Sequence, residues 1–324
     1  MSTITIIGAA GRVGHAASQG FLEAGWAVRG IGRGVKTREM AAGVMPVEAS
    51  ASDRDGLTAA CAGSDVILHA ANPPYDKWAT TVLPMIENAI AAAKATGATL
   101  MIPGNVYNFG REIGTNVSED APQIASTEKA AIRIAMEQRL EQATREDGVQ
   151  VIILRAGDFY GGPKPETWLD LMICKDLRKG KFTWPGAWNL PHAFAYLPDL
   201  GRAFAAVAEK RGELGAFERF HFAGHTLTGD EMLAATEKAT GRKLRRGGAP
   251  WTMMSLIGLL SPVLREVVKM RYLWDTAHSL DGHKLDALIG TSAVTPPVEA
   301  IRQALADLRL DDSIAPAAEK RQAA

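Results

Sequence analysis

Three regularly spaced glycines near the amino end have the pattern of a diphosphate-binding loop. Gly8, Gly11 and Gly14 directly follow the apolar run Thr3–Ile7. Between a strand and a helix, the first glycine permits a tight turn, the second lets the backbone approach a pyrophosphate, and the third allows close helix packing. The helix then points the positive end of its dipole at the phosphates. The residues expected to contact the diphosphate are Gly8, Ala10, Gly11, Arg12, Val13 and Gly14. The alternative is a glycine-rich turn without a ligand, but the place of the motif at the start of a strand–helix run favours a dinucleotide.

The residues after the second apolar run distinguish between the two nicotinamide dinucleotides. An acidic side chain there would accept hydrogen bonds from the adenosine ribose of NAD. Residues 30–34 contain no acid, and their one charged side chain is that of Arg33. A guanidinium can bind the 2′-phosphate of NADP through charge-assisted hydrogen bonds, and Lys36 and Arg38 could assist. We therefore expect NADP, with NAD as a possible cofactor; the alternative is that Arg33 is a solvated turn residue.

The elements that must position these residues alternate regularly through residue 155. The expected strands are Thr3–Ile7, 26–31, 44–47, 65–70, 98–102 and 149–154, and the expected helices are 12–24, 37–42, 54–62, 82–96 and 127–146. Short apolar strands that alternate with helices predict a parallel sheet covered on both faces. Right-handed crossovers then give an α/β fold with a Rossmann-type, doubly wound sheet.

The pattern changes after residue 156, where Gly, Pro and Trp become frequent and helical segments later dominate. We expect a smaller, mainly helical C-terminal lobe that binds substrate. The expected boundaries are a dinucleotide-binding domain at 1–158, to which 193–224 returns, a substrate-binding lobe at 159–192 and 225–312, and a flexible tail at 313–324.

Composition excludes several classes of protein. The chain has 36 Lys and Arg against 36 Asp and Glu, whereas nucleic-acid and membrane-surface proteins need a basic excess. We expect a small molecule as the partner, with no nucleic acid and no membrane. Cys61 and Cys174 lie far apart without a CxxC motif, so neither a metal site nor a disulfide framework is expected. The apolar run 251–260 is too short to cross a bilayer, the strand-like start indicates no signal peptide, and a cytoplasmic location is expected.

Several of these segments resemble the extended short-chain dehydrogenase/reductase superfamily, of the NAD-dependent epimerase/dehydratase type. Besides the glycine loop, the similar segments are 66–71 (VILHAA), 154–163 (LRAGDFYGGP) and 194–203 (FAYLPDLGRA). The resemblance implies that the fourth strand ends beside the cofactor, so Ala70, Ala71 and Asn72 are expected to contact it. It also implies a homodimer formed through the helices at 82–96 and 127–146.

The catalytic positions depart from that family, whose members carry Tyr-x-x-x-Lys on the helix after the fifth strand, with Glu four residues beyond the lysine. Alignment on Glu137 puts Arg133 at the lysine position and Lys129 at the tyrosine position. The register four residues back puts Ala125 at the tyrosine position. Neither register supplies a tyrosine, and residues 102–107 (IPGNVY) lack the family's serine. The chain is therefore expected to be an atypical member that lacks the usual pair.

A different group must then donate the proton if a carbonyl is reduced. Lys129 is the first candidate, provided that burial beside the cofactor favours its neutral form. Arg133 follows one turn later, so both could face the nicotinamide ribose. Tyr107 could donate the proton instead, and Asn105 could orient a carbonyl, since both follow the fifth strand where such sheets bind ligands. The alternatives are an exposed Lys/Arg pair and a packing aromatic.

Two further groups of residues bear on the substrate. Asn72 and Tyr75, in the loop after the fourth strand, are expected to line the site, unless that loop is only a rigid connector. A group of aromatic residues could wall an apolar pocket, although core packing is the commoner role of such clusters; it comprises Tyr160, Trp184, Trp188 and His192. Because few basic residues surround them, a nucleotide sugar would lack a second anchor, and a smaller or more hydrophobic substrate is expected.

The leading hypothesis is an NADP(H)-dependent oxidoreductase or isomerase/epimerase-like enzyme with a non-standard proton donor. Its substrate would be a small or hydrophobic carbonyl-type compound. A non-catalytic NADP-binding sensor or regulatory protein is the alternative, since superfamily members without the tyrosine can bind cofactor without turnover. A sugar-nucleotide epimerase or dehydratase with a rearranged site is a third hypothesis.

Overall fold

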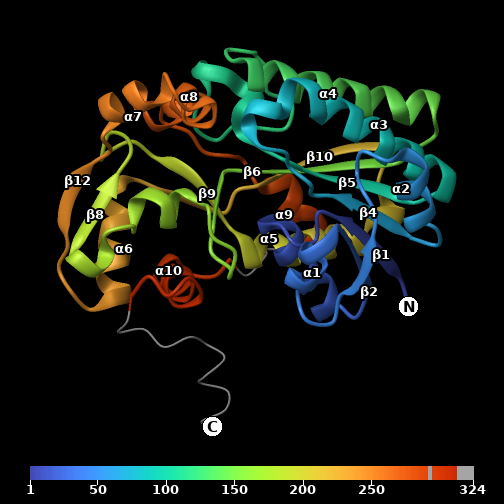
Figure 1. Ribbon diagram of the computed structural model, residues 1–324, viewed down its shortest axis with the longest axis horizontal. Helices are drawn as coiled ribbons and strands as arrows, with labels where there is room; N and C mark the ends of the chain where they lie inside the picture. Colours follow the sequence, from blue (N-terminus) through green and yellow to red (C-terminus); the bar gives the residue numbers. More distant parts are fainter. Residues whose placement is uncertain (291–293, 312–324) are drawn as a thin grey trace, which may run out of the picture.

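The computed structural model describes residues 1–290 and 294–311 (Figure 1). The expected tail at 313–324 therefore lies outside the described residues. The strands are β1 (Thr3–Ile7), β2 (Ala27–Gly32), β3 (Met45–Glu48), β4 (Val66–His69), β5 (Thr99–Gly104), β6 (Val151–Ala156), β7 (Asp158–Tyr160), β8 (Lys181–Trp184), β9 (His192–Tyr196), β10 (Phe217–Phe222), β11 (His225–Leu227) and β12 (Arg245–Gly248). The α-helices are α1 (Arg12–Glu23), α2 (Arg54–Ala60), α3 (Trp78–Thr96), α4 (Glu128–Glu146), α5 (Leu197–Glu209), α6 (Gly229–Thr240), α7 (Trp251–Gly258), α8 (Pro262–Lys269), α9 (His283–Ile289) and α10 (Pro297–Asp307).

A seven-stranded parallel sheet forms the centre of the larger lobe, with the strand order β10-β6-β5-β4-β1-β2-β3. Neighbouring residues of a strand point to opposite faces of the sheet, and both faces are covered. Ile6 packs in a core cluster with α1 and α5, whereas Ile7 packs in another cluster with α2, α3 and α4. Figure 1 shows these two helical layers on opposite sides of the sheet. The predicted Rossmann-type doubly wound sheet is confirmed.

One expected helix takes a different form. The segment predicted as a helix at 37–42 is a short 3-10 helix at Gly34–Glu39. The Thr37 hydroxyl donates a hydrogen bond to the Gly34 carbonyl over 2.7 Å, and such local bonds compete with regular α-helix. Six residues are also too few to nucleate an α-helix without tertiary packing, and no residue of this segment is buried.

The smaller lobe is mainly helical in its last part, as predicted, and contains two small sheets. β11, β9 and β7 form one, and β12 and β8 form the other. In the segment 193–224, α5 packs on α1 and β10 joins the large sheet beside β6, while β9 belongs to the three-stranded sheet. The aromatic group of the sequence analysis lies in the core of this lobe: Tyr160 and Trp184 are buried members of its cluster, Trp188 packs against the cluster, and the buried His192 stacks on Trp274. These residues therefore pack the lobe, and none of the group lines the cleft described below.

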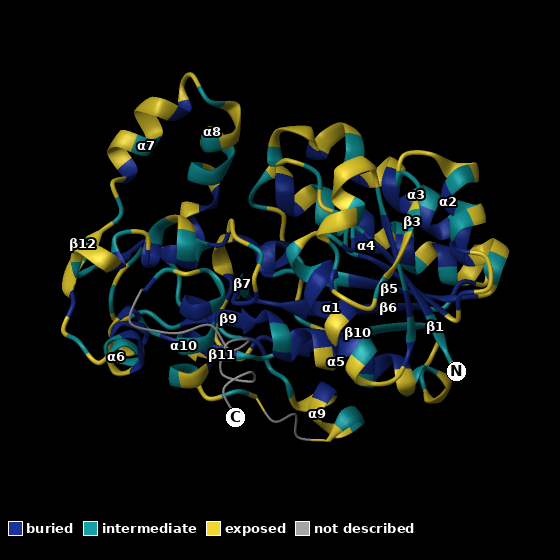
Figure 2. Cartoon of the chain, turned by 60° about the horizontal axis from the view of Figure 1, so that its bottom comes forward, coloured by how far each residue is buried: buried dark blue, intermediate teal, exposed yellow. Residues whose placement is uncertain are grey.

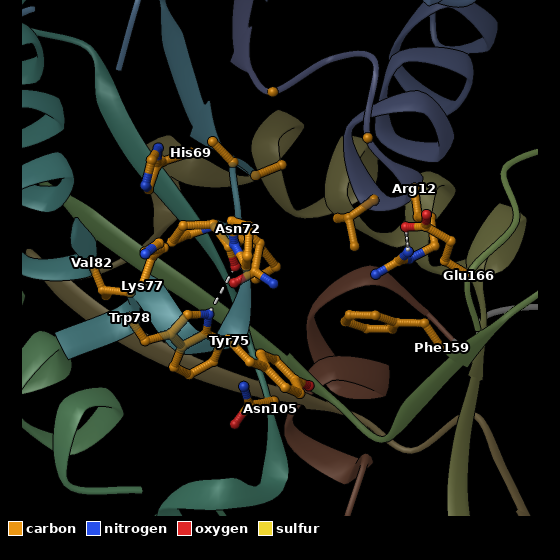
Figure 3. Close-up of a pocket in the computed structure, with 18 of the residues that line it drawn as sticks. Arg12, His69, Asn72, Tyr75, Lys77, Trp78, Val82, Asn105, Phe159 and Glu166 are labelled. Carbon is orange, nitrogen blue, oxygen red and sulfur yellow. Dashed lines mark hydrogen bonds and ion pairs between the residues drawn. The ribbon is translucent and has the colours of Figure 1, made fainter. Parts of the chain in front are cut away.

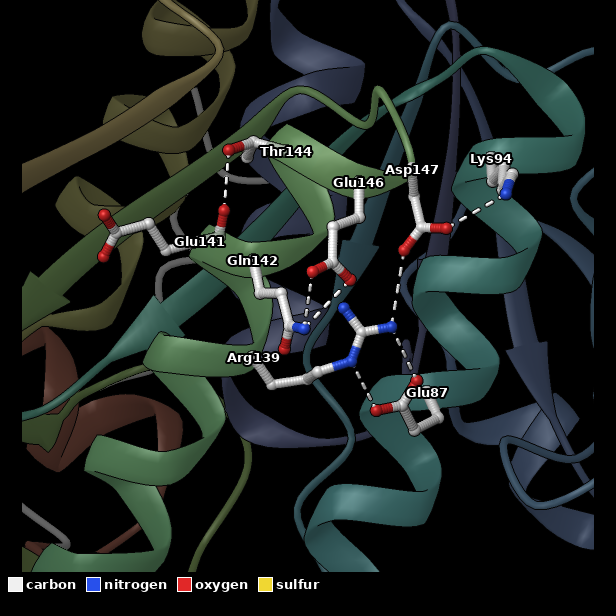
Figure 4. Close-up of polar contacts among 8 residues, drawn as sticks. All are labelled: Glu87, Lys94, Arg139, Glu141, Gln142, Thr144, Glu146 and Asp147. Carbon is white, nitrogen blue, oxygen red and sulfur yellow. Dashed lines mark hydrogen bonds and ion pairs between the residues drawn. The ribbon is translucent and has the colours of Figure 1, made fainter.

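Helices α3 and α4 lie side by side on one face of the sheet, joined by polar contacts (Figure 4). Arg139 donates to both carboxylate oxygens of Glu87, over 2.7 and 3.0 Å. Asp147 accepts hydrogen bonds from Lys94 and from Arg139. The Thr127 side chain caps the first turn of α4 by accepting from the Ala130 amide. The homodimer expected through these two helices stays a prediction.

None of the helices in the described part of the chain is long and apolar enough to span a membrane.

Candidate functional site

A cleft of about 960 Å³ opens at the carboxyl ends of β1, β2, β4, β5 and β6. This edge is where doubly wound sheets bind their ligands. Its lining includes three regions. The glycine-loop side includes Ile7, Gly8, Ala10–Val13, Arg33 and Lys36; the tyrosine side includes Tyr75, Trp78, Asn105, Tyr107 and Arg133; and the apolar chamber is formed by Trp168, Leu171, Met172, Met254, Leu264, Val267, Met270, Leu273 and Trp274.

The glycine loop has the backbone geometry that a diphosphate requires. Gly8 has a φ of +84°, and a Cβ atom there would lie 2.7 Å from Ala71 Cα. A Cβ atom on Gly14 would lie 2.2 Å from the Gly8 carbonyl oxygen. Gly11 precedes α1 and offers no side chain to cap it, so the first-turn amides are available to an anion. The residues present therefore fit the phosphates of a dinucleotide.

The structure brings the expected cofactor residues together with one exception. Those that line the cleft are Gly8, Ala10, Gly11, Arg12, Val13, Arg33, Ala70, Ala71 and Asn72. Gly14 lies behind the loop, where it lets α1 approach Gly8. Lys36 lines the cleft beside Arg33, and Arg38 is not among the lining residues.

The smaller lobe crosses the cleft near the glycine loop (Figure 3). The Arg12 guanidinium lies 3.4 Å from the Glu166 carboxylate and 3.3 Å from the Pro165 carbonyl oxygen. Lys164 donates to the Glu39 carbonyl over 2.7 Å. Glu166 is a lining residue that the sequence reasoning missed, because nothing in a single sequence indicates a contact across 154 positions.

Two phenols meet on the tyrosine side. The hydroxyls of Tyr75 and Tyr107 lie 2.7 Å apart in a hydrogen bond. Burial raises the pKa of the Tyr107 phenol well above its ordinary value, and burial likewise raises the pKa of Tyr75. Both phenols are therefore neutral at physiological pH and can donate a proton.

Arg133 and His69 also line the cleft. The Arg133 guanidinium lies 4.7 Å from the ring centre of Trp78 and donates to the Pro103 carbonyl over 3.4 Å. Burial, and then the charge of Arg133, lower the pKa of His69 to about 4, so this imidazole is neutral. Within the described residues, His69 Nδ1 and Arg133 Nε are buried without a hydrogen-bond partner. Such atoms are unusual in a protein interior, and here they adjoin a cleft that a ligand could fill.

Comparison with known proteins identifies the family and the fold. The profile of the NmrA-like family matches residues 1–295. The chain belongs to the NmrA-like family. A search of curated proteins found no match.

Solved structures share the fold of this NmrA-like protein at low sequence identity. UDP-N-acetylglucosamine 4-epimerase from Bacillus cereus matches with a TM-score of 0.74 and 13% identity, covering 94% of this chain and 98% of that one. UDP-glucuronic acid 4-epimerase from Bacillus cereus in complex with NAD matches with a TM-score of 0.72 and 19% identity, covering 93% and 96%. The Bordetella bronchiseptica enzyme WbmH in complex with NAD+ matches with a TM-score of 0.71 and 20% identity, covering 95% and 99%. The predicted likeness to the extended short-chain dehydrogenase/reductase superfamily is confirmed at the level of the fold.

In this NmrA-like protein, the side chain of Lys129 does not lie in the cleft with that of Arg133. Its amino group forms an ion pair with Glu266 of α8 and lies 4.9 Å from the ring centre of Tyr75. Lys129 is absent from the cleft lining, whereas Arg133 belongs to it. The expectation that both side chains face the cleft is therefore not met. A buried ammonium needs a counterion, and Glu266, from 137 positions along the chain, supplies it.

Asn105 shapes the turn that carries Tyr107. Its side-chain oxygen accepts a hydrogen bond from the Tyr107 amide over 3.0 Å, and its carbonyl accepts one from Arg155 over 2.6 Å. Arg155 is held in turn by both carboxylate oxygens of Glu137, over 2.8 and 2.9 Å. This buried ion pair therefore fixes the backbone from which Tyr107 projects. Sequence reasoning used Glu137 only to set a register, and it missed Arg155.

Asp158 is a further acidic group of the lining that the sequence did not single out. His192 Nε2 lies 2.8 Å from Asp158 Oδ2, and the His192 ring stacks on Trp274 with ring centres 4.0 Å apart. The carboxylate thus has a partner behind the cleft wall. Among the described residues, no group of His, Cys, Asp or Glu side chains has the arrangement of a metal site.

Proposed function

We propose that this NmrA-like protein binds NADP(H) in the cleft and reduces the carbonyl of a small or hydrophobic compound. One observation carries the proposal: a single cleft joins the glycine loop to the hydrogen-bonded phenols of Tyr75 and Tyr107. The fold shared with two NAD complexes supports a nicotinamide dinucleotide. When bound, such a cofactor supplies a hydride to the carbonyl carbon.

Two cations support the preference for NADP(H). Arg33 and Lys36 both line the cleft after β2, where a 2′-phosphate would lie. The acidic side chains among the lining residues, Asp158 and Glu166, both come from the smaller lobe. No lining acid of β2 or its following turn is therefore placed to bind the ribose hydroxyls of NAD.

Tyr107 is the proposed proton donor. Its phenol gives a proton to the carbonyl oxygen, and the hydrogen bond with Tyr75 lets the second hydroxyl share the charge that remains. The half-buried Arg133 guanidinium, whose positive charge acts on both phenols, stabilises that charge. Lys129 anchors α8 in this scheme and donates no proton.

Substitution of Tyr107 and Lys129 tests the assignment. Tyr107→Phe should lower kcat for carbonyl reduction about 10²–10⁴-fold, the usual contribution of a positioned acid. NADPH affinity, measured by fluorescence titration, should stay unchanged. Lys129→Met keeps the length of the side chain, and Glu266 retains Lys269 as a partner at 2.5 Å. The kcat at saturating carbonyl should therefore change only a few-fold, while the loss of the Lys129–Glu266 anchor raises KM for the carbonyl. The reverse pattern, with turnover lost in Lys129→Met and kept in Tyr107→Phe, would show that the lysine is the donor.

The pH dependence provides a second test. Because burial raises the pKa of Tyr107, the donating form persists as pH rises and is lost only well above about pH 10. His69, with a pKa lowered to about 4, stays neutral throughout the same range. The kcat for reduction should therefore be flat from about pH 6 to about pH 9. A rise or fall of kcat with a midpoint between about pH 6 and about pH 9 would exclude Tyr107 as the donor.

A sensor or regulatory protein is the second candidate function. The observation that favours it is helix α4, whose residues include no tyrosine. NADPH binding without turnover of any compound in a wide panel of aldehydes, ketones and enones would support the sensor and contradict the reductase.

A further inference from the structure

Helices α7 and α8 form a hairpin with two different apolar faces. This α7–α8 hairpin, residues 251–269, stands at the end of the smaller lobe, and much of its surface is exposed or half-buried (Figure 2). One face is turned to solvent and includes Met253, Leu256, Ile257 and Leu260, the last of which is 91% exposed. The other face supplies Met254, Leu264 and Val267 to the cleft.

The inner face completes the apolar chamber. Leu171 and Met172 line the same cleft from the helical turn Leu169–Ile173, and Met270 and Leu273 line it from the segment after α8. Methionine and leucine side chains offer contact area without hydrogen-bonding groups, and methionine adapts to irregular shapes. A chamber of this kind binds a hydrocarbon chain or ring system.

The charged residues of the smaller lobe that line the cleft are both negative. Asp158 and Glu166 are both acids: the first is bound by His192, whose ring stacks on Trp274 of the chamber, and the second is paired with Arg12. The chamber residues themselves carry no charge, so an anion there would lose its hydration without gaining a counterion. Arg133 lies on the tyrosine side, where the carbonyl would be reduced.

The position of the hairpin is fixed from outside the cleft. Glu266 of α8 pairs with Lys129 of α4 and with Lys269. The Lys129 side chain is 3% exposed, so this ion pair is shielded from solvent and holds α8 beside Tyr75. The inner face therefore has a defined place relative to the phenol pair.

We propose that the α7–α8 hairpin determines substrate specificity by binding the apolar body of an uncharged carbonyl compound with several carbons beyond the carbonyl. The inference rests on the proposed function, because it names the substrate class of the same cleft. Each methylene group added to the substrate should improve affinity about fourfold until the chamber is filled.

Binding of an uncharged fluorescent ketone tests the inference without requiring turnover. Prodan, a naphthyl ketone whose emission shifts to the blue in apolar surroundings, should bind the full-length protein both with and without NADPH. Leu264→Gln and Met254→Gln on the inner face should weaken this binding about tenfold or more. Leu260→Gln is the matched control on the same hairpin, and it should leave binding within about twofold. Equal weakening by Leu260→Gln and Leu264→Gln, or no binding at all, would overturn the inference.

Competition against prodan defines the class of ligand. Within the 2-alkanones from 2-butanone to 2-decanone, the inhibition constant should fall about fourfold per added carbon until the chamber is filled. Decanoate, of the same chain length as 2-decanone but anionic, should compete at least tenfold less well. A flat series, or decanoate equal to 2-decanone, would contradict the inference.

The outcomes separate this inference from the proposed function. If the protein binds no NADPH, or oxidises none with any carbonyl, while the prodan results hold, the reductase proposal fails and the hairpin assignment stands. If short and long ketones are reduced with the same KM, the reductase proposal stands and the hairpin assignment fails.

Discussion

The glycine-loop side and the tyrosine side of the cleft are built in different ways. Gly8, Gly11 and Gly14 shape the first through backbone within seven consecutive positions. The second depends on side chains from segments far apart, such as Tyr75 and Tyr107, with Arg155 behind them. A site made of local backbone is visible in a sequence as a motif. A site made of distant side chains depends on the packing of the whole fold, and its supports can be as important as the residues that line it.

The largest predicted effect is a loss of stability when the Glu137–Arg155 ion pair, which supports the tyrosine side, is broken. Glu137 and Arg155 are 3% and 1% exposed, so Glu137→Ala leaves a buried guanidinium without its counterion. Removing one partner of a buried ion pair lowers the free energy of unfolding by about 3–5 kcal/mol. Urea denaturation followed by circular dichroism measures this change. If Glu137→Ala fails to fold, Glu137→Gln, which keeps the shape but removes the charge, should still fold with reduced stability.

The control for this prediction is another glutamate that binds arginine through two hydrogen bonds. Glu87 pairs with Arg139 between α3 and α4, but the two side chains are 46% and 25% exposed. Exposed ion pairs contribute only about 0–1 kcal/mol, so Glu87→Ala should be nearly neutral. Equal destabilisation by the two substitutions would show that burial is not what makes the Glu137 pair important.

The contrast also explains what could be predicted from the sequence. The strands β1 to β6 and the glycine loop follow from local signals, since each strand is an apolar run and the motif lies between β1 and α1. Tyr107, Asn105 and Arg133 could be proposed because they follow β5 or lie on α4, and all three line the cleft.

The orientation of individual side chains could not be predicted in the same way. Lys129 and Arg133 are one helical turn apart, yet the first pairs with Glu266 and the second faces the cleft. The deciding partner comes from α8, and helical periodicity carries no information about it. The contacts of Glu166 with Arg12 and of Arg155 with Glu137 are non-local in the same sense.

The next largest predicted effect is a loss of NADPH affinity when the backbone of the glycine loop is disturbed. Gly8→Ala places a methyl group 2.7 Å from Ala71 Cα at a φ of +84°, so the loop must move away from the geometry that binds phosphate. We expect NADPH affinity to fall at least about 100-fold, equivalent to about 2.7 kcal/mol. Gly63→Ala is the matched control, because Gly63 also has a positive φ, of +71°, but nothing lies within 4 Å of the added atom. It should lose some stability and no NADPH affinity, so a similar loss of affinity in both variants would contradict a local role for Gly8.

The smallest predicted effect is the loss of NADPH affinity when the Arg33 side chain is removed from the glycine-loop side. Arg33 follows β2 and lines the cleft, but it is exposed and contributes nothing to the backbone cradle. Arg33→Ala should therefore weaken NADPH about tenfold through the loss of charge-assisted hydrogen bonds to the 2′-phosphate. NADH, which lacks that phosphate, should keep its affinity within about twofold. Calorimetric titration of both cofactors at two salt concentrations checks this, since the Arg33 contribution should shrink as salt screens it. Equal losses of affinity for NADPH and NADH would show that Arg33 acts on the loop as a whole. On this side of the cleft, it would then be wrong that the backbone binds the cofactor while a side chain selects between NADPH and NADH.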